Sequence, residues 1–101
     1  MSGPVHVIAH FTIEDRERYL RYADAFLPVL EGYDGRVVSV DDNVATLEGE
    51  WADGRTVVLE FVSEAEFRSW WESPEYQAIA TDRIEGTRAH SVVLVHAPPW
   101  G

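Results

Sequence analysis

The alternation of apolar and polar residues near the start of the chain predicts a strand followed by a long helix. Bulky apolar and polar residues alternate from Val5 to Thr12, as is typical of a strand. Ile8 lies on the otherwise polar face, so both faces of this strand are expected to be covered. Asp15 then caps a helix that runs to about Glu31. One stripe of this helix is apolar and consists of Tyr19, Tyr22, Ala23, Phe26 and Leu30.

The middle of the chain predicts two further strands with a turn between them. Arg36–Val40 has the pattern of a strand, and Val44–Glu50 continues in extended form. Asp53-Gly54 favours a tight hairpin turn, because two-residue turns with positive φ prefer this pair. The strand that follows, Arg55–Val62, is the most apolar of the chain and is expected to be central in the sheet.

The stretch from Phe61 to Gln77 predicts two short helices that meet at a corner. Ser63 caps the first helix, which ends near Glu72. Ser73-Pro74 then starts the second helix, because serine is a good N-cap and proline fits the first helical position. The break gathers the aromatic side chains of this region around one corner, which is the best candidate for a binding pocket. Its expected members are Trp70, Trp71, Tyr76 and Arg83.

The order of elements predicts the fold class. The second short helix runs from Pro74 to about Ile84, and His90–His96 is the last strand. The order β-α-β-β-α(α)-β with right-handed crossovers favours an α+β, ferredoxin-like split βαβ antiparallel sheet with helices on one face. Residues 1–97 are expected to form this single domain, with 98–101 as a C-terminal tail. The other face of the sheet has no helix to cover it and is expected to pack against a second copy.

Composition supports self-association. Hydrophobic residues make up 46% of the 101 residues, with four Trp, four Tyr and four Phe. A chain of this size buries only part of its apolar surface by itself. A homodimer is therefore the simplest expectation.

Charge and missing residue types exclude several classes of function. The net charge of -10, with 18 acidic against 8 basic residues, disfavours nucleic-acid binding and attraction to anionic membranes. The chain has no Cys, which excludes disulfides, thiolate metal sites and cysteine nucleophiles. It shows neither a signal peptide nor a membrane span, so a cytoplasmic location is expected. It also has no glycine-rich phosphate loop and no serine in a nucleophile elbow.

Several motifs together resemble a known family. The chain resembles the small bacterial domain-of-unknown-function family 1330, within the dimeric α/β-barrel superfamily. The more specific motifs are Glu48-Gly49 with Trp51, and Ser73-Pro74-Glu75-Tyr76-Gln77; the more general ones are Val7-Ile8-Ala9, Asp15 with Tyr19 and Tyr22, Leu59-Glu60-Phe61, and Val92-Val93-Leu94-Val95.

The resemblance implies a homodimer whose two sheets face each other as a dimeric α/β barrel, but it implies no reaction. Relatives in the superfamily include cofactor-free monooxygenases, isomerases and haem-degrading enzymes, and their pockets usually lie between helices and sheet. The chain departs from the family pattern in its His96–Gly101 tail and in having Trp70 beside Trp71.

The four histidines raise the question of a metal site. His6 and His10 share one strand face, and His90 and His96 share a face of the last strand, which neighbours the first. Imidazole suits Zn, Cu and Ni, so a histidine-only site is conceivable. The alternative is that these histidines are solvated at strand ends. No Asp or Glu accompanies them at ligand spacing, and neither a metal nor a cofactor is expected.

His10 and Glu60 are the candidate catalytic residues. If the face of His10 is the helix-covered one, its imidazole is a candidate general base; otherwise it is a hydrogen-bonded structural histidine. Glu60 lies in the most apolar strand, so burial would raise its pKa unless an arginine pairs with it. Arg36 and Arg83 are the candidate partners, and a structural ion pair is the alternative role of Glu60.

Five residues are candidates for ligand binding. Tyr22 and Tyr76 offer phenol hydroxyls above apolar rings, and Trp71 offers an aromatic wall. Arg83 is expected to clamp a carboxylate with two hydrogen bonds, unless it pairs with Glu60. Trp51 either caps one end of the pocket or packs in the dimer.

These residues lead to two hypotheses of function from different classes. In the first, the homodimer binds a small, partly apolar or aromatic metabolite between helices and sheet and acts on it as a cofactor-independent enzyme, of isomerase, cyclase or monooxygenase type. In the second, the same pocket belongs to a non-catalytic binder. A purely structural dimer, whose aromatic residues only pack, is the remaining alternative.

Overall fold

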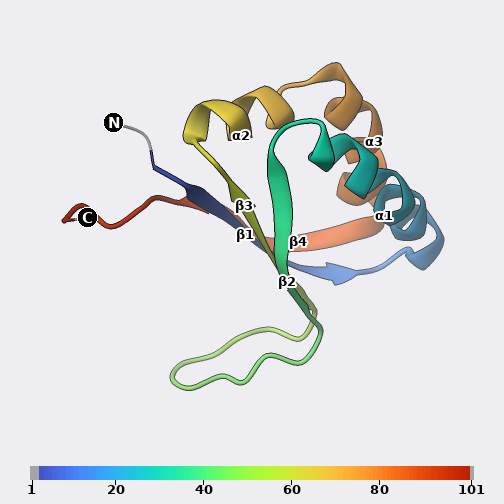
Figure 1. Cartoon of the computed structure of the whole chain (residues 1–101). Coiled ribbons are helices and arrows are strands. Elements are labelled where there is room, and N and C mark those ends of the chain that lie inside the picture. Colours follow the sequence, from blue (N-terminus) through green and yellow to red (C-terminus); the bar gives the residue numbers. More distant parts are fainter. Residues whose placement is uncertain (1–2, 101) are drawn as a thin grey trace.

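One antiparallel sheet and three helices make up residues 3–100, which are the residues that this computed structural model describes (Figure 1). The strands lie in the order β2-β3-β1-β4, and all neighbours are antiparallel. This α+β, ferredoxin-like arrangement confirms the predicted fold class. The elements are β1 (Val5–Ile13), α1 (Arg16–Glu31), β2 (Gly35–Asp41), β3 (Arg55–Phe61), α2 (Glu64–Trp71), α3 (Pro74–Gly86) and β4 (Thr87–Val95).

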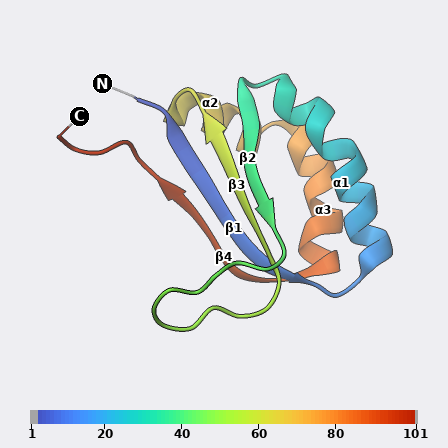
Figure 2. The same ribbon diagram turned by 60° about the horizontal axis from the view of Figure 1, so that its bottom comes forward.

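The helices lie on one face of the sheet, as predicted. Figure 2 shows α1 and α3 side by side, with α2 above the end of the central strands. The helix-facing residues of β1 and β3 alternate with residues of the opposite face, and Val7 lies directly across from Leu59. The buried core therefore lies between the helices and this face, and it includes Phe11, Tyr19, Leu30, Phe61, Phe67 and Ala80.

The connection from β2 to β3 differs from the prediction. Residues 42–54 form a long loop that projects from the sheet, in place of an extended strand and a tight turn (Figure 2). Two hydrogen bonds of 2.7 and 2.9 Å join the Arg55 guanidinium to the Asp42 carboxylate and close the base of the loop. Pairing of the two strands ends next to this clamp, at Asp41 and Thr56.

Gly54 does not serve the two-residue hairpin turn that was predicted for it. Its φ is 149°, and a Cβ at this position would lie 2.4 Å from the carbonyl oxygen of Phe11. The missing side chain therefore allows the end of the loop to approach β1 closely.

The corner between α2 and α3 forms as predicted. Ser73 is buried, and its hydroxyl accepts a hydrogen bond from the backbone N–H of Tyr76 (3.0 Å). The same hydroxyl donates to the carbonyl oxygen of Trp70 (2.8 Å), which lies in the last turn of the preceding helix. Pro74 occupies the first turn of α3, where the missing N–H has no helical partner to lose. One side chain thus joins the end of one helix to the start of the next.

Replacing Ser73 tests this junction. Ser73→Ala removes the cap of α3 and the bond to Trp70, so we expect a loss of about 1–2 kcal/mol in the free energy of unfolding, measured by urea denaturation. Ser69→Ala, on the exposed surface of α2, is the matched control and should change that free energy by less than about 0.5 kcal/mol. Equal effects of the two substitutions would contradict a stabilising role for the junction.

Candidate functional site

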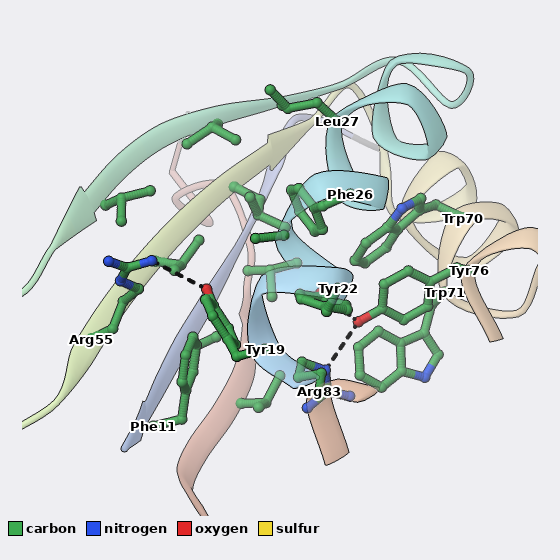
Figure 3. A pocket seen from close by; sticks show the side chains of 18 residues that line it. Phe11, Tyr19, Tyr22, Phe26, Leu27, Arg55, Trp70, Trp71, Tyr76 and Arg83 are labelled. Atoms are coloured by element: carbon green, nitrogen blue, oxygen red, sulfur yellow. Dashed lines mark hydrogen bonds between the residues drawn. The ribbon is translucent and has the colours of Figure 1, made fainter. Parts of the chain in front are cut away.

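A cavity of about 330 Å³ lies between the helices and the helix-facing side of the sheet (Figure 3). Its walls are almost entirely apolar and aromatic. Val7, Ala9, Phe11, Val37, Val40, Val57, Leu59 and Val92 line it from the sheet. Ala23, Phe26, Leu27, Trp70 and Trp71 line it from the helices. The polar side chains of the lining are Tyr19, Tyr22, Tyr76, Arg55 and Arg83.

The aromatic corner lies at this cavity, as predicted. The ring centroids of Trp70 and Tyr76 are 4.0 Å apart, and those of Trp71 and Tyr76 are 5.6 Å apart. The guanidinium carbon of Arg83 lies 5.8 Å from the centroid of the Trp71 ring, within the range of a cation–π contact. The break at Ser73 thus brings together residues from the last turn of α2 and from two turns of α3.

Two phenol hydroxyls meet in the cavity wall. The hydroxyl oxygens of Tyr22 and Tyr76 are 3.0 Å apart and share a hydrogen bond. Arg83 donates from Nε to the Tyr76 hydroxyl at 3.2 Å (Figure 3). Burial raises the pKa of Tyr22, and the neighbouring Tyr76 raises it further, so Tyr22 remains a neutral phenol at physiological pH.

Arg55 also lines the cavity, and the sequence reasoning missed it. Its Nη1 donates to the Tyr19 hydroxyl at 3.4 Å, while its other nitrogens bind Asp42. Hydrogen bonding from Arg55 lowers the pKa of Asp42, so this pair stays ionised and its charges cancel. Arg55 has the same strand parity as Val57 and Leu59, a signal from which its position could have been found.

His10 does not lie in the cavity. Its neighbours Ala9 and Phe11 face the helices, so strand alternation points His10 to the opposite side of the sheet. It is nevertheless only 3% exposed, because the loop 42–54 covers it. The Trp51 ring stacks on it at 4.1 Å, and its Nε2 donates to the carbonyl oxygen of Ala52 at 2.8 Å. The condition under which His10 is a candidate general base, a helix-covered face, is therefore not met: a loop covers His10, not a helix.

Glu60 also lies on the face away from the helices. It lies beside His6 of the neighbouring strand β1. Its two oxygens contact Arg36 Nε at 2.9 Å and His6 Nε2 at 3.0 Å. Arg36 lowers the pKa of Glu60, which is the opposite of the rise expected for an unpaired buried carboxyl. Glu60 is thus part of an ion pair with Arg36, and Arg83 is not its partner.

Trp51 does not cap the cavity either. It is 44% exposed on the open face, where it covers His10 and donates from Nε1 to the Thr56 hydroxyl at 3.2 Å. Of the predicted site residues, the structure therefore brings four to the cavity: Tyr22, Trp71, Tyr76 and Arg83. His10, Trp51 and Glu60 lie on the other face of the sheet.

The histidines of the described residues are engaged in other contacts. His96 contacts Glu64 at 2.8 Å, and His90 contacts the Thr12 hydroxyl at 2.8 Å. Residues 3–100 contain no cluster of three or more histidine or carboxylate side chains placed to hold a metal ion. Within the same residues, no helix combines the length and the apolar character that crossing a membrane requires.

The buried Tyr22 phenol predicts a loss of stability at alkaline pH. Unfolding returns its raised pKa to the ordinary value of about 10, so its stabilisation is complete below that pH and is lost as the pH rises above it. We expect the free energy of unfolding, measured by urea denaturation, to fall less between about pH 8 and about pH 11 in Tyr22→Phe than in the wild type. Equal slopes, or tyrosinate absorbance from Tyr22 while the chain is still folded, would contradict this account.

Solved structures with a similar fold are known. A methylated form of RPA0582, a protein of unknown function from Rhodopseudomonas palustris, has a TM-score of 0.79 at 19% identity, over 100% of this chain and 85% of that one. SnoaB, a cofactor-independent oxygenase from Streptomyces nogalater, has a TM-score of 0.58 at 15% identity, over 95% and 94%. A dimeric protein of unknown function with a ferredoxin-like fold from Bacteroides fragilis has a TM-score of 0.55 at 17% identity, over 94% and 97%. At these identities the likeness shows the fold alone.

The sequence also matches a family model. None of the curated proteins matches the chain. The model of a domain of unknown function (DUF1330) matches residues 4–97, which is nearly the whole sequence and agrees with the resemblance seen in its motifs. The chain belongs to the DUF1330 family.

Proposed function

We propose that this protein binds a small, largely apolar or aromatic molecule in the cavity between its helices and its sheet. The cavity itself carries the proposal, because about 330 Å³ of space remains among side chains that would otherwise close-pack. This volume is at the lower end of the range for small-molecule sites, and an apolar lining with a few polar groups is typical of them. Leu27 and Val40, each 52% exposed, give the cavity an apolar rim that solvent reaches.

Catalysis without a cofactor is the second candidate function. It is favoured by the convergence of Tyr22, Tyr76 and Arg83 in one wall, and by the similar fold of SnoaB, a cofactor-independent oxygenase. Among the described residues, however, the lining contains no Asp, Glu or His that could take a proton from the bound molecule. Binding therefore has more support than catalysis.

We also propose that the protein is a homodimer, which packs through the open face of its sheet. Val93 and Val95 are exposed on this face, beside the half-buried Ile8 and Val58. A row of apolar side chains on an uncovered sheet is typical of an interaction surface. The Bacteroides fragilis protein of similar fold is described as dimeric, which supports this arrangement.

Filling the cavity tests the binding function. N-phenyl-1-naphthylamine, a neutral apolar dye, should fluoresce strongly with the wild type, because the cavity removes it from water. Ala23→Trp places a large ring in the cavity and should weaken dye binding at least about tenfold, since it occupies the volume the dye needs. Ala65→Trp on the exposed surface of α2 is the matched control and should bind as the wild type does. Unchanged binding by folded Ala23→Trp would refute the cavity as the site.

A charge on the open face tests the dimer. Val93→Glu places a carboxylate where a second copy would pack, so we expect sedimentation to show a dimer for the wild type and a monomer for the variant. Ile84→Glu, at an exposed apolar position on α3, is the control and should leave the dimer intact. A wild type that sediments as a single subunit at micromolar concentration would rule out the interface.

A further inference from the structure

Arg83 is a cation without a counter-charge in an acidic chain. The sequence holds 18 acidic residues against 8 basic ones, so carboxylates are abundant. Arginines elsewhere use them: Arg18, Arg21, Arg36, Arg55, Arg68 and Arg88 each form an ion pair. Within residues 3–100, no carboxylate lies within 4 Å of Arg83, although this side chain lines the cavity. Arg16 shares this lack of a partner in the same range, but it is exposed and lies outside the lining.

The guanidinium of Arg83 is held in position while its outer edge stays available. Nε donates to the Tyr76 hydroxyl, and the Trp71 ring lies beneath the guanidinium group. These two contacts fix the side chain. Within the described residues its two terminal nitrogens have no acceptor, so the fork of Nη1 and Nη2 has donors to spare. A half-buried cation with unused donors favours an anionic oxygen as its partner.

The phenol pair supplies one more donor at the same place. Tyr22 and Tyr76 carry two hydroxyl hydrogens, and the hydrogen bond between their oxygens uses one of them. Arg83 only donates, so it satisfies an oxygen lone pair and neither hydrogen. One phenol hydrogen therefore remains without an acceptor in the described part of the chain. The two tyrosines and Arg83 lie next to one another in the wall of the cavity (Figure 3).

The other guanidinium of the lining, that of Arg55, already has a counter-charge. Figure 3 shows Arg55 on the side of the cavity away from Arg83. Two hydrogen bonds to Asp42 neutralise it. Apart from the Tyr19 hydroxyl, which accepts from Arg55, the remaining walls are apolar, so the lining offers one positive charge that no carboxylate compensates.

We propose, on the basis of the binding function above, that the ligand is an organic monoanion with an apolar or aromatic body. Its anionic oxygen binds the Arg83 fork and the free phenol hydrogen of the Tyr22–Tyr76 pair. Its body lies along Trp71 and the valines of the sheet. A carboxylate, a phenolate and an enolate share this chemistry, whereas a sugar, a phosphate ester or a dicarboxylate would leave polar groups against apolar walls.

A matched pair of probes tests the charge preference. Naphthalene-1-carboxylate and naphthalene-1-carboxamide have the same shape and differ in charge. We expect the wild type to bind the carboxylate at least about tenfold more tightly than the amide in calorimetric titrations at neutral pH. The protein's net charge of -10 repels anions, so such a preference must come from the local site.

Variants assign the preference to Arg83. Arg83→Gln should reduce the carboxylate-to-amide ratio to about one, while Arg83→Lys should retain part of it. Arg68→Gln lowers the net charge by the same amount on the outer surface of α2 and should leave the ratio unchanged. Benzoate and naphthalene-2-carboxylate are titrated as additional carboxylate probes, so that the poor fit of one probe does not decide the result.

The outcomes separate this inference from the proposed function. If the amides bind as tightly as the carboxylates, or Arg83→Gln keeps the wild-type ratio, the cavity binds apolar molecules and the monoanion proposal is refuted. If neither the carboxylates, the amides nor the neutral dye binds, the binding function itself fails. A carboxylate preference that disappears in Arg83→Gln, is partly retained in Arg83→Lys and is unchanged in Arg68→Gln supports both.

Discussion

The bend at Ser73 is the constraint on which the cavity depends. A single hydroxyl bonds the last turn of α2 and the first turn of α3, so each helix end has a partner for one of its free backbone groups where the chain turns. Trp70 comes from one side of the bend and Tyr76 from the other. Arg83 follows Tyr76 by two helical turns and therefore lies on the same side of α3. The aromatic wall and its cation are thus positioned by one buried serine.

The sheet separates two kinds of chemistry. Its helix-facing side carries valines and aromatic rings, whose bulk and shape leave space beneath the helices. Its open side carries the pairing of Glu60 with Arg36, together with the stack of His10 and Trp51. Alternation along the strands keeps these sets apart, since neighbouring residues point to opposite faces. A residue of the open face cannot reach a molecule in the cavity without a change of register, and such a change would turn the whole strand over.

Local signals in the sequence were enough to predict most of the fold. Capping serines at Ser63 and Ser73, together with helical and strand periodicity, predicted the helices and the four paired strands near their observed positions. The gathering of Trp71, Tyr76 and Arg83 followed from the helix break. These features depend on contacts within a few residues of the chain, which a single sequence records directly.

The parts that were missed depend on contacts between distant segments. Strand alternation groups His10 with His6, but which face the helices cover is decided by packing, and Phe11 was the better indicator of the covered face. Val44–Glu50 was expected to continue in extended form after the second strand, but the structure has no strand in this segment. The ion pair between Arg55 and Asp42 joins the two ends of that loop, and the local sequence pattern does not predict it.

The anchoring of the loop 42–54 has a consequence for how this chain tolerates change in length. Contacts fix it at both ends: Arg55 binds Asp42, and the Thr12 hydroxyl donates to the carbonyl oxygen of Asp53. Leu47, between these anchors, is almost fully exposed. The entropy of closing a loop grows only with the logarithm of its length, so residues added near Leu47 cost little as long as both anchors remain. This segment is thus where a peptide tag or a reporter domain can be inserted while the sheet and the helices keep their geometry.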